Sequence, residues 1–196
     1  MKNYSNFALS AFLMVTFAVT SCSDDQVSDP VPTKASIYER LGGTTMVADP
    51  NNVGQMIEKG RLSYRTVVNR TIGLIVADIQ ANNQGNLSAH FAPILAETGT
   101  TQSTSIAVLS DSLTDFFSFN TGGTNAVNTY NGKSMVAAHN PTTYARMGAK
   151  SNNANYTRFV GFIGQAANEA GVATGTELYV DIVAVLESLR TSIVQS

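Results

Sequence analysis

The chain has 196 residues, of which 43% are hydrophobic and 13% are charged. A chain of this length and composition can bury one sizeable core, which excludes the fibrous and disordered classes. Its 12 Lys and Arg against 14 Asp and Glu leave a formal net charge of -2. Binding to nucleic acid needs a clustered basic surface that this composition does not supply, so we expect no nucleic-acid partner.

The first 21 residues have the pattern of a secretion signal. Lys2 precedes an apolar-rich run from Phe7 to Val19, which is shorter than the roughly 20 residues that a membrane-spanning helix needs. The single cysteine follows in Val19-Thr20-Ser21-Cys22, and this segment resembles the lipobox of bacterial lipoproteins. The resemblance implies that residues 1–21 are a signal peptide and that Cys22 is lipidated. The lipid would then hold the protein in the cell envelope, at the outer membrane or its periplasmic face. From the residues alone, a small cysteine buried in an N-terminal helix is the alternative.

Residues 22–34 differ in composition from the sequence that follows. The segment is polar and acidic, contains Pro30 and Pro32, and has few apolar residues. Such a segment cannot build a core of its own and predicts a flexible tether. We therefore expect the folded part to be a single domain that spans residues 35–196.

Apolar residues recur every three or four positions in four stretches of this domain, which is the period of an amphipathic helix. The stretches are 68–79, 106–116, 156–170 and 178–193. The last two are expected to pack as an antiparallel pair, because a short segment joins them. Asn- and Gly-rich compositions typical of turns occur at 82–86, 98–104, 122–131 and 151–155. No convincing alternation of apolar and polar residues predicts a strand, so the sequence predicts an all-α fold.

Few residues offer catalytic or metal-binding chemistry. The chain has two histidines, His90 and His139, and lacks the glycine-rich motifs of nucleophile elbows and phosphate loops. With one cysteine, it has no Cys-x-x-Cys zinc or haem-attachment pattern. A zinc site would need carboxylates in addition to two isolated histidines. A single histidine is enough where a macrocycle supplies the other ligands, as in haem proteins.

Four segments resemble group I truncated haemoglobins and occur in the order of that family. The segments are Ser36–Gly43, Leu87–Phe91, Phe116-Phe117 followed by Gly122-Gly123, and Tyr130–His139. The last contains the family's Tyr-x-Gly-x-x-Met-x-x-x-His run and is the most specific. The resemblance covers about residues 35–194 and implies a two-over-two helical sandwich that binds haem b non-covalently.

The same resemblance assigns residues to the haem site. His139 would be the iron ligand, Phe91 would stack on the porphyrin, and Lys133 and Arg146 would pair with the haem propionates. The cofactor-binding residues it implies are Ile72, Phe91, Leu109, Leu113, Phe117, Tyr130, Lys133, Met135, His139 and Arg146. His90, which adjoins Phe91, is expected to be a loop histidine rather than a sixth iron ligand.

The sequence departs from the family on the side where a gas ligand would bind. Ile72 takes the place of a tyrosine that commonly donates a hydrogen bond to bound oxygen, and Leu109 and Leu113 offer no polar partner. Thr71 and Ser110 are the nearby polar candidates. Three joints are also longer than in the family: Thr45–Arg65, Ile94–Ser105 and Tyr144–Asn155.

These residues predict reversible binding of a diatomic gas, with carbon monoxide or nitric oxide favoured over retained oxygen. Nitric oxide dioxygenation or a peroxidase-like activity is implied by the family but is weakened by the missing donor. The reductant and any protein partner are unknown. Another class of function stays open: a globin-shaped lipoprotein that carries haem as cargo, or a haem-free interaction module.

Overall fold

The computed structural model describes residues 33–96 and 106–196. The chain divides into two compact units, Met1–Thr33 and Lys34–Ser196, and the elements below belong to the second. The predicted signal peptide, Cys22, nearly all of the predicted tether and the turn at 98–104 lie outside the described residues.

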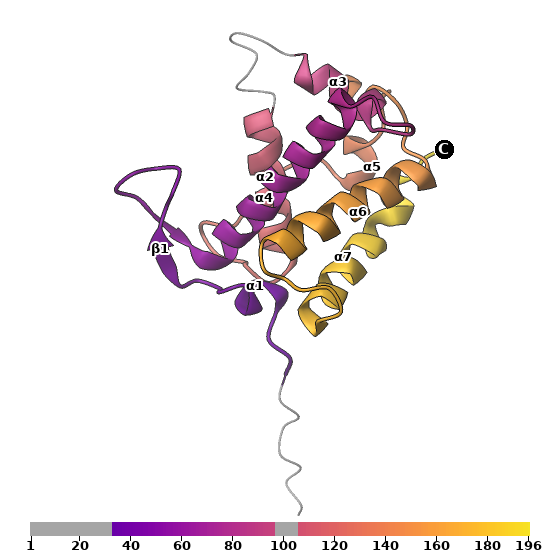
Figure 1. The fold of residues 1–196 in the computed structure, drawn as a ribbon. Helices are drawn as coiled ribbons and strands as arrows, with labels where there is room; N and C mark the ends of the chain where they lie inside the picture. The colour runs from indigo at the N-terminus through magenta and orange to yellow at the C-terminus, as the bar shows by residue number, and fades with distance from the viewer. Residues whose placement is uncertain (1–32, 97–105) are drawn as a thin grey trace, which may run out of the picture. The chain divides into compact units, whose positions relative to one another are not determined.

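Long helices occupy the four stretches that the apolar period predicted. They are α2 (Lys59–Gln80), α4 (Ile106–Asn120), α6 (Asn153–Glu169) and α7 (Glu177–Ile193). Helix α2 packs against both α4 and α6, and α6 packs against α7, which returns in the opposite direction after a short loop (Figure 1). The predicted helical character is therefore confirmed for the described part of the chain.

Shorter helical elements complete the domain. They are α1 (Ile37–Arg40), α3 (Ser88–Leu95), α5 (Met135–Ala138) and a 3-10 turn, η2 (Ala145–Met147). Helix α1 begins with a capping box, in which the Ser36 side chain and Glu39 satisfy each other's backbone N–H groups. It ends at Arg40, and Gly42 and Gly43 follow with φ of 115° and 53°, in the left-handed region that favours glycine.

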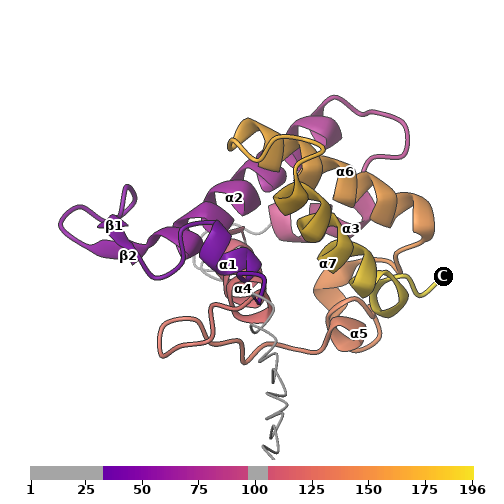
Figure 2. The ribbon, with the colours of Figure 1, turned by 90° about the horizontal axis from the view of Figure 1, so that it is seen from below.

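The expectation of a fold without strands was wrong. Strands β1 (Met46–Ala48) and β2 (Met56–Glu58) form an antiparallel hairpin inside the long joint Thr45–Arg65. In both strands apolar residues follow one another without polar ones between them, so the alternation that normally indicates a strand is missing. Figure 2 shows the hairpin projecting from the helices.

The core lies where α2, α6 and α7 meet. Its buried apolar side chains include Val68, Ile75, Tyr156, Ile163, Ala166 and Leu186. The Tyr156 hydroxyl donates a 2.5 Å hydrogen bond to the Leu186 carbonyl oxygen, which fixes α6 against α7. Arg158 of α6 pairs with the buried Asp78 of α2, and its guanidinium lowers the pKa of that carboxyl.

A buried polar cluster fastens the hairpin to the helices. The Tyr38 hydroxyl donates to the Glu58 carboxylate, and the Asn128 amide donates to both of these groups. Tyr38 packs closely against Gly60, where a Cβ atom would lie 2.8 Å from its ring. Burial, together with the bond to Glu58, raises the pKa of Tyr38 to about 12.

Two predicted boundaries shift in the structure. Lys34, expected in the tether, forms salt bridges of 2.7 Å to Glu177 and 2.5 Å to Asp181 of α7. The expected turn at 151–155 instead contains the start of α6, because Asn152 and Asn155 form a reciprocal cap. Asparagine is common both in turns and in caps, and composition alone does not distinguish them.

No helix in residues 33–96 and 106–196 is both long and apolar enough to cross a membrane.

We expect Leu186→Ala to lower the free energy of unfolding by about 3 kcal/mol, because it leaves a cavity at a fully packed position. Leu186 is 2% exposed at the α6–α7 seam. The matched control, Val180→Ala on the same helix, removes a side chain that is 56% exposed and should cost less than about 0.5 kcal/mol. Urea denaturation measures both, and equal effects would show that the buried face of α7 is assigned wrongly.

Candidate functional site

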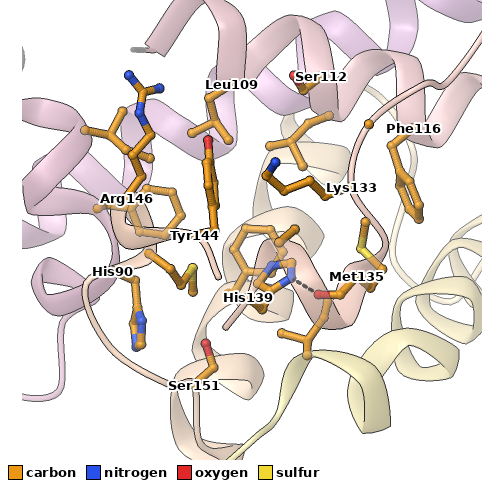
Figure 3. Close-up of a pocket in the computed structure, with 18 of the residues that line it drawn as sticks. His90, Leu109, Ser112, Phe116, Lys133, Met135, His139, Tyr144, Arg146 and Ser151 are labelled. Atoms are coloured by element: carbon orange, nitrogen blue, oxygen red, sulfur yellow. Dashed lines mark hydrogen bonds between the residues drawn. The ribbon is translucent and has the colours of Figure 1, made fainter. Parts of the chain in front are cut away.

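The candidate site is a cavity of about 340 Å³, a size typical of small-molecule and cofactor sites. Its wall combines α3, α4, α5, η2 and the start of α6 with the loop before α5. Apolar side chains make up most of the wall, and a few polar ones are interspersed among them. Figure 3 shows His139 near the centre of this arrangement, with Leu109 of α4 on the opposite wall.

Eight of the ten residues selected from the sequence line this cavity together. They are Phe91, Leu109, Leu113, Tyr130, Lys133, Met135, His139 and Arg146. They come from three separate parts of the chain, namely Phe91 on α3, Leu109 and Leu113 on α4, and the segment from Tyr130 to Arg146, and the fold brings these parts together.

The other two selected residues lie elsewhere. Ile72 is buried on α2 but is not part of the cavity wall. Phe117 lines a smaller apolar cavity of about 40 Å³ and stacks on Tyr64, with ring centroids 6.0 Å apart. Its neighbour Phe116 takes the place in the large cavity, because consecutive residues of a helix point about 100° apart.

His139 is oriented by a hydrogen bond within its own helix turn. Its Nδ1 lies 2.8 Å from the carbonyl oxygen of Met135 (Figure 3). A carbonyl oxygen only accepts, so Nδ1 must carry the proton and Nε2 keeps its lone pair. Metal-ligating histidines characteristically donate their other ring N–H in this way.

The surroundings of His139 also favour the neutral form of its ring. Burial lowers the pKa of His139 below its ordinary value, and the nearby His90 lowers it further. The hydrogen bond to Met135 opposes these two effects. A neutral imidazole is the form that binds a metal ion.

His90 lines the same cavity and is 5% exposed. Its Nδ1 lies 3.2 Å from the carbonyl oxygen of Ala149. His90 is thus a buried wall residue of α3 and not a loop histidine, which corrects the expectation from the sequence.

The last residues of the chain hold the wall that carries His139. The Gln195 side-chain amide donates a 2.8 Å hydrogen bond to the carbonyl oxygen of Val136 in α5. The Gln195 backbone N–H donates to the carbonyl oxygen of Ser151 at 3.0 Å, beside a parallel bridge between Ser151 and Val194. The position of α5 therefore depends on the end of α7.

Sequence reasoning missed Tyr144, which also lines the cavity. Its hydroxyl points toward Leu109 and forms no hydrogen bond with another described residue (Figure 3). The Lys133 ammonium lies 5.3 Å from the centroid of the Tyr144 ring. Tyr130 differs, because its hydroxyl donates a 2.7 Å hydrogen bond to the Lys133 carbonyl oxygen. Tyr144 belongs to none of the motifs that the sequence analysis singled out, although Arg146 two residues later does line the cavity as expected.

Thr71 and Ser110, the polar candidates near Ile72, form hydrogen bonds outside the cavity. Thr71 donates to the carbonyl oxygen of Val67 at 2.8 Å, and Ser110 donates to the Asn69 side chain at 2.5 Å. Neither residue lines the large cavity. The Tyr144 hydroxyl, unlike these two, does line the cavity and is a candidate donor to a ligand there, beside other polar side chains of the wall such as Ser112 and Lys133.

The donor set suits an iron porphyrin better than a bare metal ion. Within the described ranges, no group of three or more His, Cys, Asp and Glu side chains can hold a metal. A porphyrin supplies four ligands and needs one imidazole from the protein. An apolar cavity with an oriented, neutral His139 and a cationic Lys133 at its wall fits that requirement.

No protein-family model matches the chain, and no curated protein sequence matches it. The residues and geometry of the cavity therefore carry the functional assignment.

We expect nitrogen NMR of the haem-free protein at neutral pH to find the His139 proton on Nδ1, with a titration midpoint below the ordinary histidine value. Since the unfolded chain binds the proton more readily, the free energy of unfolding should fall as the pH drops through the range below about 6.5. A His90→Asn variant assigns the signals. A proton found on Nε2 would contradict the geometry described above.

Proposed function

We propose that the domain is a haem-b-binding protein of the truncated-globin type that reversibly binds a diatomic gas. The observation that carries this proposal is the convergence of the sequence-selected residues on one cavity, with His139 oriented by Met135. The resemblance in the Tyr130–His139 segment supports it independently of the cavity. Haem b, when bound, supplies an iron atom that binds the gas.

Different residues of the chain would hold the iron, the porphyrin face and the propionates of the haem. His139 would ligate the iron through Nε2, and Phe91 would pack on the porphyrin face. Lys133 and Arg146 would neutralise the propionates through charge-assisted hydrogen bonds. Leu109 and Leu113 would exclude water from the face opposite His139.

The proposed location is the cell envelope, with a lipid on Cys22 as the anchor. The support is the sequence alone: an apolar run of signal-peptide length followed directly by Val19-Thr20-Ser21-Cys22. A domain outside the cytoplasm would meet dissolved gases directly, but its reductant would have to reach it from a partner.

The central test is an absorption titration of the protein with haemin, before and after reduction by dithionite. We expect the wild-type protein to bind one equivalent and to give a ferrous spectrum with a single imidazole ligand. His139→Ala should abolish stoichiometric binding or remove the imidazole signature, and added imidazole should restore it.

The control is His90→Ala, which removes the other imidazole in the same cavity. It should keep the iron–imidazole spectrum. The reverse pattern would move the ligand role to His90. If the wild-type protein takes up no haem, the alternative of a haem-free interaction module replaces this proposal.

Tyr144 changes the expectation of an entirely apolar ligand face. If its hydroxyl donates one hydrogen bond worth about 1.4 kcal/mol, Tyr144→Phe should speed oxygen dissociation roughly tenfold. Tyr130→Phe is the matched comparison and should have the smaller effect, because that hydroxyl is already bound to Lys133. Stopped-flow measurement of oxygen dissociation from the reduced, haem-loaded protein tests this expectation. Equal dissociation rates for wild type and Tyr144→Phe would show that the Tyr144 hydroxyl donates no hydrogen bond to the ligand.

A further inference from the structure

The β1–β2 hairpin exposes apolar side chains on one face. The register pairs Val47 with Ile57, Ala48 with Met56 and Met46 with Glu58. Ile57 is buried on one face, and alternate residues of a strand point to opposite faces, so Met46, Ala48 and Met56 lie on the other face together with the buried Glu58, which is bonded to Tyr38 and Asn128. Met46 is 51% and Met56 is 56% exposed. An antiparallel sheet that packs on one side normally presents polar residues to water on the other, and this hairpin does not.

The tip of the hairpin adds one large apolar side chain among neutral polar ones. Val53 is fully exposed in the loop between the strands. Between Gly43 and Ile57 the sequence contains one ionisable side chain, Asp49. That carboxylate is buried against Arg65, with an N–O distance of 2.5 Å, and the guanidinium lowers its pKa. The hairpin that projects from the helices in Figures 1 and 2 therefore exposes no charged side chain between Gly43 and Ile57, and its large exposed apolar side chains are Met46, Val53 and Met56 beside the neutral amides of Asn51, Asn52 and Gln55.

We propose that Met46, Val53 and Met56 insert into the interfacial layer of the lipid bilayer that carries the chain's own anchor. This inference rests on the lipid anchor of the proposed function and does not depend on haem. The hairpin would then be a second attachment point, which orients the domain on the membrane.

The length of the chain before the domain favours the bilayer as the surface that the hairpin contacts. Eleven residues lead from Cys22 to Thr33, where the described chain begins. At roughly 3.6 Å per residue they span at most about 40 Å, so a lipidated Cys22 keeps the domain near the membrane. Tethering makes the second contact intramolecular, and a few apolar side chains then suffice for a contact that would be weak in free solution.

The hairpin is poorly suited to the main alternative, strand pairing with a second copy of the chain. Each strand has three residues, which offers few backbone hydrogen bonds to an added strand. Insertion into lipid needs no such bonds from the hairpin edge. The absence of exposed charge also removes the main cost of entering the headgroup layer.

The chain contains no tryptophan, so Val53→Trp creates a single fluorescent probe at the hairpin tip. The lipidated, full-length variant is reconstituted in vesicles of phosphatidylethanolamine and phosphatidylglycerol, with and without brominated acyl chains. We expect a blue-shifted emission that brominated lipid quenches by at least half. The control is Val180→Trp on α7, at another exposed valine, and its emission should be neither shifted nor quenched by the vesicles.

A further variant links the probe to the apolar face. Adding Met46→Ser and Met56→Ser to V53W should reduce the quenching severalfold. V53W emission that matches V180W in both vesicle types would overturn the proposal. A blue shift without lipid that grows with protein concentration would also overturn it and assign the face to a second copy.

Mass spectrometry of the membrane-bound protein separates failure of the anchor from failure of the hairpin. A Cys22 that carries no acyl group would overturn both the anchor and this inference. An acylated Cys22 together with an unquenched V53W probe would overturn this inference alone.

Discussion

The position of His139 depends on hydrogen bonds from the end of α7. Helix α5 has four residues and no buried side chain, and a helix of this length does not persist by itself. Gln195 ties α5 to the C-terminal strand-like segment, and the Ser151–Val194 bridge ties that segment to the start of α6. The imidazole is thus fixed by elements that the α6–α7 seam already holds rigid. Loosening that seam is expected to disturb the cavity before the long helices unfold.

This arrangement separates stability from function within one small domain. Helices α2, α6 and α7 bury the core, while most of the polar groups of the cavity lie on α3, α5, η2 and their loops. Short elements and loops are where proteins commonly place ligand-binding groups, because a rigid scaffold can position them. His139 is the clearest case, since its tautomer follows from one backbone carbonyl, and burial favours its neutral state by lowering its pKa.

The sequence predicted the long helices well, because residues such as Val68, Ile75 and Leu186 recur with the helical period and are buried as that period implies. It failed at the hairpin, where Met46-Val47-Ala48 shows no alternation. The cavity was predicted largely through the resemblance around His139. Phe117 was misplaced because helix rotation by one residue changes the face that a side chain occupies, and Ile72 was misplaced because it lies on α2, which contributes no residue to the cavity wall. Tyr144 belongs to no periodic stretch and to no quoted motif, and only the fold shows that it reaches the cavity.

The central claim, that His139 holds the iron of a haem, is tested most directly by resonance Raman spectroscopy of the reduced, haem-loaded His90→Ala protein. His139 is then the only histidine in the chain. The account predicts an iron–imidazole stretching band that moves to lower frequency when the histidine ring carries the heavy nitrogen isotope. A band that does not move, or no such band in a protein that has bound haem, would contradict it.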